Sequence, residues 1–63
     1  MTNEQKVEIE STLTRLIEMY NAKTTPKADR WGLAQYIAGI EKTLNVLGYE
    51  AKFNPFDGTY SIK

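Results

Sequence analysis

The sequence predicts an α+β domain in which an antiparallel pair of helices is followed by a two-stranded β-hairpin packed on them. Two long segments repeat apolar residues at helical spacing, and after Gly48 the repeat changes to a period of two. Asparagine, proline, aspartate and glycine then interrupt that alternation between residues 54 and 58. A chain of 63 residues holds one small core, so we expect a single domain over residues 1–63.

The first helix is predicted over residues 3–22. Its apolar side chains form one stripe of a 3.6-residue helix, at Ile9, Leu13, Leu16, Ile17 and Tyr20. Thr2 and Gln5 have the spacing of a capping box, which pairs backbone N–H groups of the first helical turn.

The second helix has two possible starts in the sequence. In one, Thr25 is the N-cap and Pro26 the first helical residue; in the other, Asp29 is the N-cap. Gly48 is well placed to end the helix. Its apolar stripe consists of Leu33, Ile37, Ile40, Leu44 and Leu47. Because a short loop joins two amphipathic helices, we expect them to pack antiparallel.

The remaining residues predict a hairpin. Apolar and polar side chains alternate over residues 49–54 and again over residues 59–63, where Tyr60 and Ile62 share a face. Asp57-Gly58 can supply the positive φ angle of the turn. An isolated two-stranded hairpin is marginally stable in water, so its apolar face is expected to rest on the helices.

Composition argues against several classes of function. The chain has no cysteine and no histidine, which removes thiolate chemistry and the commonest general base and metal ligand. No motif for a nucleophile or a phosphate-binding loop is present, so we expect no enzyme, no cofactor and no metal.

No apolar run approaches the roughly 18 residues of a membrane span, and the polar N-terminus does not resemble a signal peptide. We therefore expect a cytoplasmic protein without a membrane partner.

The charge balance makes nucleic acid an unfavoured partner. Eight basic and eight acidic side chains give a net charge of zero, so a long-range field toward phosphates is missing. The alternative function is nonetheless nucleic-acid binding by a cationic cluster beside an aromatic ring, at Lys23, Lys27, Arg30 and Trp31. The other interpretation is that Trp31 closes the end of the core.

Gly32 and Gly39 fall on one face of the second helix, where Thr43 and Val46 continue a band of slender side chains. Each glycine costs a helix interior about 1 kcal/mol relative to alanine, which indicates a close approach by another segment. That segment is either the hairpin or first helix of the same chain, or a helix of a partner.

Both edges of the hairpin are predicted to be open, which invites pairing with a second chain unless Lys52 and Lys63 discourage it. Phe56 lies in the turn, either folded under the hairpin or displayed to a partner. We therefore predict a small non-catalytic protein-interaction module that self-associates, with a homodimer favoured over a monomer and a different protein partner left open. The predicted interface residues are Gly32, Gly39, Thr43, Val46, Phe56, Tyr60 and Ile62.

Overall fold

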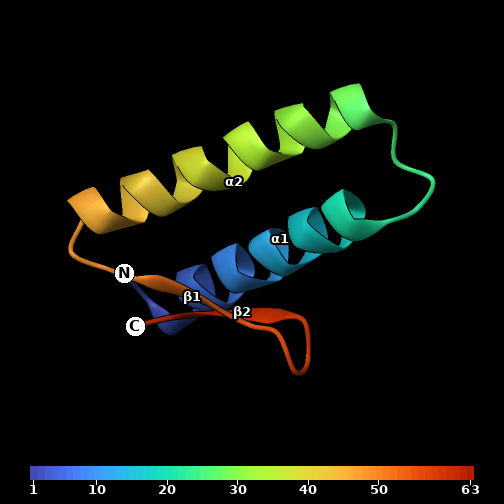
Figure 1. The fold of residues 1–63 in the computed structure, drawn as a ribbon. Helices are drawn as coiled ribbons and strands as arrows, with labels where there is room; N and C mark the ends of the chain where they lie inside the picture. The colour runs from blue at the N-terminus through green and yellow to red at the C-terminus, as the bar shows by residue number, and fades with distance from the viewer.

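The computed structural model describes residues 1–63 and confirms the predicted fold class, two helices followed by an antiparallel hairpin. Figure 1 shows the helices running in opposite directions, with α1 between α2 and the hairpin in that view. Neither helix combines the length and the apolar character that crossing a membrane requires. The elements are α1 (Asn3–Asn21), α2 (Lys27–Val46), β1 (Ala51–Asn54) and β2 (Thr59–Ile62).

Helix α1 begins with the predicted capping box. The Gln5 backbone N–H donates to the Thr2 hydroxyl at 3.1 Å, and the Thr2 N–H donates to the Gln5 side-chain oxygen at 2.9 Å. These bonds pair N–H groups that the start of a helix otherwise leaves to water. The helix ends at Asn21, close to the predicted end at residue 22.

Helix α2 begins at neither of the two predicted positions. Its N-cap is Pro26 and its first helical residue is Lys27. No side chain caps α2, and the Thr25 hydroxyl instead donates a 2.6 Å hydrogen bond to the Met19 carbonyl at the end of α1. Asp29 lies inside the first turn, where the helix dipole favours a negative charge.

Gly48 ends α2 as predicted. It has a φ of 89°, a conformation that glycine adopts without steric cost. The Tyr49 N–H donates to the Leu44 carbonyl at 2.8 Å, and the Gly48 N–H donates to the Asn45 carbonyl at 3.0 Å. This pair of bonds is a Schellman motif, which satisfies carbonyls at the helix end and turns the chain toward β1.

The hairpin has the predicted alternation and turn. Ala51 lies opposite Ile62, and Phe53 lies opposite Tyr60 with the two ring centroids 5.3 Å apart. Gly58 adopts the positive φ, 71°. In the turn, the Asp57 carboxylate accepts hydrogen bonds from the hydroxyl and the N–H of Thr59, which lower the pKa of Asp57.

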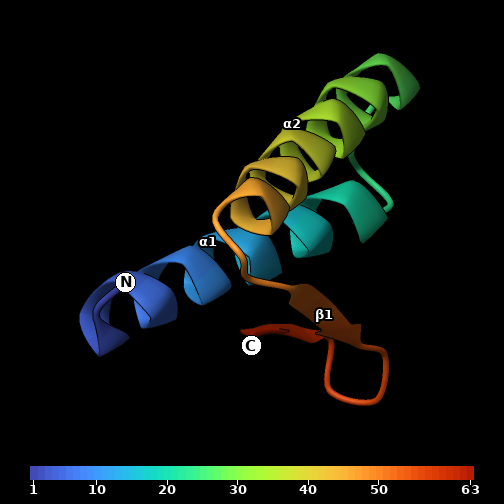
Figure 2. The same cartoon turned by 90° about the vertical axis from the view of Figure 1, so that its left-hand side faces the viewer.

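The core lies where both helices meet the apolar face of the hairpin. Figure 2 shows the helices crossing at an angle above the hairpin. Four side chains are buried, one from α1, two from α2 and one from β2: Leu13, Ile37, Leu44 and Ile62.

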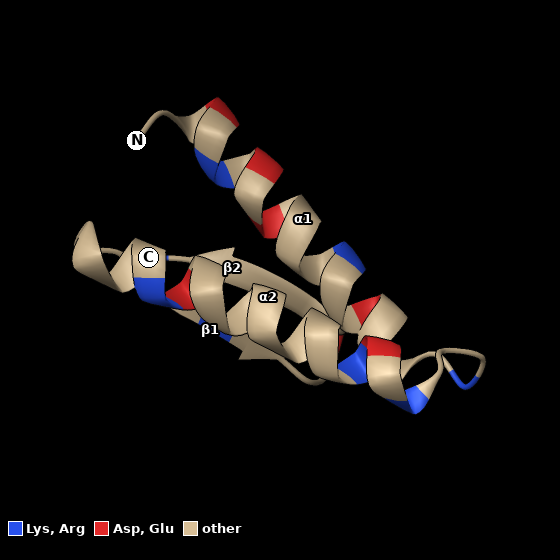
Figure 3. Ribbon diagram, turned by 90° about the horizontal axis from the view of Figure 1, so that it is seen from above, with Lys and Arg blue, Asp and Glu red and all other residues tan.

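Leu47 is a correction to the predicted core stripe of the second helix, because its side chain is 64% exposed. It follows the last helical residue, Val46, as the C-cap. The helices diverge toward the N-terminal end of α1 (Figure 3), and Leu47 lines the open notch there together with Met1, Ile9 and Tyr49. The position has no α1 residue packed closely enough to bury it.

Candidate interaction surfaces

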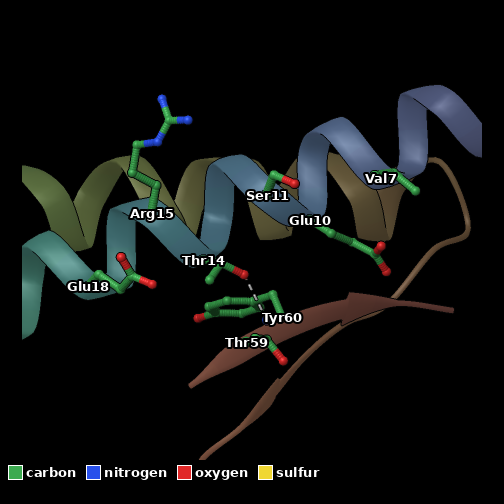
Figure 4. A pocket seen from close by; sticks show the side chains of 8 residues that line it. All are labelled: Val7, Glu10, Ser11, Thr14, Arg15, Glu18, Thr59 and Tyr60. Carbon is green, nitrogen blue, oxygen red and sulfur yellow. Dashed lines mark hydrogen bonds between the residues drawn. The ribbon is translucent and has the colours of Figure 1, made fainter. Parts of the chain in front are cut away.

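A polar hollow lies between α1 and the end of the hairpin. Figure 4 shows Glu10 and Thr14 reaching from α1 toward β2, while Arg15 points away from the strands. Both reaching side chains already accept hydrogen bonds from the β2 backbone. The lining residues are Val7, Glu10, Ser11, Thr14, Arg15, Glu18, Thr59 and Tyr60.

The two edges of the hairpin differ. Glu50 and Lys63 exchange two backbone hydrogen bonds of 2.9 Å. Because hydrogen-bonded and non-hydrogen-bonded pairs alternate along an antiparallel ladder, the N–H groups of Tyr60 and Ile62 point away from β1. The Ile62 N–H donates to the Glu10 carboxylate at 2.7 Å, and the Tyr60 N–H donates to the Thr14 hydroxyl at 3.0 Å. The prediction of two open edges is therefore wrong for β2.

The edge of β1 is open. By the same alternation, the N–H groups of Ala51 and Phe53 point outward on the opposite side of the hairpin, and neither has a hydrogen-bond partner in the chain. Lys52, between them, is exposed on the other face of the strand. This edge is where an additional strand can pair with the hairpin.

The glycine face of α2 is uncovered. A Cβ atom built on Gly32 or Gly39 meets nothing within 4 Å. The interpretation that the hairpin or α1 lies over this face is therefore wrong, because those elements pack on the Ile37 and Leu44 side of α2. Thr43 and Val46 are also exposed, the latter by 80%. We define the open face of α2 as Gly32, Tyr36, Gly39, Thr43 and Val46.

The cationic cluster is partly assembled. Lys27, Arg30 and Trp31 line one hollow, whereas Lys23 lies in the loop before α2. Trp31 is 71% exposed, so the interpretation that it closes the core is wrong. Arg30 is half-buried and donates a 3.3 Å hydrogen bond to the Ala22 carbonyl, which ties that cation to the end of α1.

The hairpin residues of the predicted interface divide into two groups. Phe56 is 98% exposed and is therefore displayed, not folded under the hairpin. Ile62 is 1% exposed and Tyr60 is half-buried against the core. The prediction that these two residues belong to an interface is therefore wrong, because their face of the sheet packs on the helices.

The pKa of Tyr60 is raised above its ordinary value. Burial raises it, and the nearby Glu41 carboxylate, 3.4 Å from the Tyr60 hydroxyl, raises it further.

No protein family, curated protein or solved structure matches this chain. What the surfaces can bind therefore follows from their own chemistry. No group of three acidic side chains lies together as a metal site would require. Four surfaces carry exposed apolar or aromatic side chains: the open face of α2, the indole of Trp31, the notch lined by Leu47, and the edge of β1 with Phe56 in the turn.

Glu10 and Thr14 are the residues that sequence reasoning missed. They lie four positions apart on α1, a rise of about 6 Å, and their partners lie two positions apart on β2, about 7 Å. Because the two spacings nearly match, two side chains on one face of a helix can accept hydrogen bonds from two successive outward N–H groups of a strand. A polar pair at i and i+4 beside the apolar stripe was the available signal.

Proposed function

We propose that this chain is a small non-catalytic protein-interaction module that self-associates as a homodimer. The observation that carries the proposal is the surface area of the single chain, 4859 Å². A folded monomer of 7.2 kDa is expected to expose about 4,100 Å², so this chain exposes about 700 Å² more. That excess is close to the roughly 800 Å² that each partner loses in a protein interface of standard size.

The chemistry of the exposed surface supports the same proposal. Only four residues are buried, and small domains without disulfides or metals often depend on a second subunit for stability. Aromatic side chains are common anchors of protein interfaces. The large apolar side chains exposed by more than half are Val7, Trp31, Tyr36, Val46, Leu47 and Phe56.

The proposal is tested by thermal unfolding at a series of protein concentrations. Association of folded chains stabilises them by mass action, so we expect the midpoint temperature to rise with concentration across the range in which dimers form. A monomer unfolds at the same temperature at every concentration. A constant midpoint from micromolar to millimolar protein would contradict the proposed self-association.

Nucleic-acid binding is the second candidate function, and the exposure of Trp31 beside Lys27 is the observation that favours it. An exposed indole next to a cation suits stacking on an unpaired base. The adjacent Asp29 and the bond from Arg30 to Ala22 weaken the site for phosphate. Titration with single-stranded oligonucleotides at low salt, followed by the fluorescence of Trp31, tests this candidate; unchanged emission would remove it.

A further inference from the structure

We infer that the homodimer forms by antiparallel pairing of α2 with α2 of a second copy, through the open face of α2. This inference rests on the proposed self-association and names its surface. Three observations carry it: the face is apolar and unpartnered, its shape is self-complementary, and one flank brings a cation to an aromatic ring.

The open face of α2 carries no charge to be removed from water. Residues 31–40 contain no charged side chain, and Figure 3 shows this stretch as an uninterrupted tan segment of α2 between the charged residues at its two ends. The Thr43 hydroxyl donates a 2.8 Å hydrogen bond to the Gly39 carbonyl, so its polar group is already satisfied within the helix. Covering this face therefore leaves no polar atom of Thr43 or Gly39 unpaired.

The shape of the face suits a second copy of itself. Gly32 and Gly39 lie about two helical turns apart, and Tyr36 lies between them and is 61% exposed. A twofold interface joins the same patch on both chains. When two antiparallel helices meet about an axis near Tyr36, Gly32 of one faces Gly39 of the other, and each tyrosine ring lies over the notch left by a glycine of the second copy.

The surface along α2 is large enough for pairing with a second copy of the chain. Hollows on both sides of Tyr36 extend from Met19 near the interhelix loop to Thr43, and polar side chains, among them Asp29, line them together with apolar ones. Helix α2 has 20 residues and spans about 30 Å, most of the protein's longest dimension of 34 Å. A contact along most of this length is long enough to bury an area on the order of 700 Å² per chain, the size of the excess.

One flank of the pairing is electrostatically favourable. Trp31 and Lys42 share a flank of α2 because their spacing is close to three helical turns. Antiparallel pairing about the same axis brings the Trp31 indole of each chain beside Lys42 of the other. A lysine over an indole face is attractive, and this contact accounts for a tryptophan that is 71% exposed in the single chain.

The edge of β1 is a poorer surface for a second copy. The outward N–H groups of Ala51 and Phe53 can pair with a second copy about an axis at Ala51, Lys52 or Phe53. Only the axis at Lys52 places two like charges directly opposite each other. The edge is short, however: β1 has 4 residues and α2 has 20, so α2 offers the longer surface for self-association.

Disulfide cross-linking tests the pairing, because the chain has no cysteine of its own. Gln35→Cys lies beside the proposed axis, so we expect it to form a disulfide-linked dimer under mild oxidation. Ala34→Cys is the matched control, because Ala34 is exposed and lies about 140° around the helix from Gly39; it should remain mostly monomeric under denaturing, non-reducing conditions. Lys52→Cys tests the alternative pairing through the edge of β1, in which this variant would form the disulfide-linked dimer.

Leucine substitutions at Gly39 and Ala34 provide the second test. Gly39→Leu fills the space beside the glycine that the second copy would occupy, so we expect the dimer dissociation constant to rise at least about tenfold, while Ala34→Leu leaves it within about threefold. The monomer should still fold, since no neighbouring atom lies within 4 Å of the added Cβ.

The outcomes separate the two claims. A wild-type dimer in which Lys52→Cys cross-links and Gln35→Cys does not would overturn the α2 pairing and leave the proposed function standing. A dimer that tolerates Gly39→Leu as well as Ala34→Leu would also overturn it. A wild-type chain that stays monomeric at every concentration would contradict both claims.

Discussion

The carboxylate of Glu10 on α1 accepts a 2.7 Å hydrogen bond from the backbone N–H of Ile62 on β2. Together with the bond from the Tyr60 N–H to the Thr14 hydroxyl, this contact pairs the outward donors of β2 with helix side chains. The hairpin is therefore closed on one edge and open on the other. A further strand can therefore pair with the hairpin only at the edge of β1.

Removal of the Glu10 carboxylate should destabilise the chain. We expect Glu10→Ala to lower the free energy of unfolding by about 1–2 kcal/mol, because it leaves a backbone N–H beside the core without an acceptor. Glu8→Ala is the matched control: Glu8 is exposed, its side chain has no hydrogen-bond partner, and the change should stay within about 0.5 kcal/mol. Urea denaturation of both variants measures the difference, and equal effects would contradict the assigned role of Glu10.

Hydrogen exchange should distinguish the two edges of the hairpin. The amides of Tyr60 and Ile62 are hydrogen-bonded to α1 and should exchange more slowly than those of Ala51 and Phe53, which face outward from β1. Residue-resolved exchange by NMR, at a concentration where the chain is monomeric, measures this order. Equal exchange at all four amides would show that the helix does not protect β2.

The burial of Leu13 and the exposure of Leu47 predict opposite responses to the same substitution. Leu13 is 0% exposed, and a buried Leu→Ala change costs about 2–5 kcal/mol, close to the whole stability of a domain this small. We expect Leu13→Ala to be largely unfolded at 25 °C by circular dichroism. Leu47→Ala, at a position that is 64% exposed, should unfold at nearly the wild-type temperature, and a large loss there would contradict its placement outside the core.

Alanine should have opposite effects at two glycines. At Gly39, inside α2 with open space around it, alanine should raise the free energy of unfolding by up to about 1 kcal/mol. At Gly48, where φ is 89°, alanine should lower it by about 1 kcal/mol because an L side chain is strained in that conformation. Denaturation at monomeric concentrations measures both; a loss of stability at Gly39 would indicate a packing contact that the structure does not have.

Tyr60 should make the chain sensitive to alkaline pH. Burial, reinforced by Glu41, raises the pKa of Tyr60 in the folded state above its ordinary value of 10.0. As pH rises above 10, the unfolded chain loses this proton first, so the free energy of unfolding falls until the folded-state pKa is passed. Tyr60→Phe should show a shallower fall than wild type over that range, with Tyr20→Phe as a tyrosine control outside the hairpin. Parallel curves for wild type and Tyr60→Phe would be inconsistent with this account.

The sequence predicts the elements of this fold well because their signals are local. The Thr2 and Gln5 capping box, the helix end at Gly48 and the turn at Asp57-Gly58 each depend on residues within a few positions of one another. The start of α2 was missed: its N-cap is Pro26, without a side-chain capping bond, and the Thr25 hydroxyl bonds back to Met19 across the loop. That contact with the preceding helix is not visible in the local pattern from which the two caps were predicted.

The surfaces were harder to predict because they depend on how the elements pack. Glycine in a helix indicates space, but Gly32 and Gly39 do not reveal whether that space is filled within the chain. The hydrogen bond that closes the edge of β2 joins Glu10 to Ile62, 52 positions further along the chain, and no local sequence pattern indicates such a contact. The exposure of Trp31 follows only from which side of α2 faces α1, and the sequence left open whether the indole closes the core.

The most direct test of the central claim is the absolute mass of the wild-type chain in solution, measured by light scattering behind a sizing column across a wide range of concentrations. The account predicts a mass that rises from 7.2 kDa toward twice that value and stops there, since a twofold interface is closed. A mass that stays at 7.2 kDa at every concentration would contradict self-association, and with it the assignment of the open face of α2.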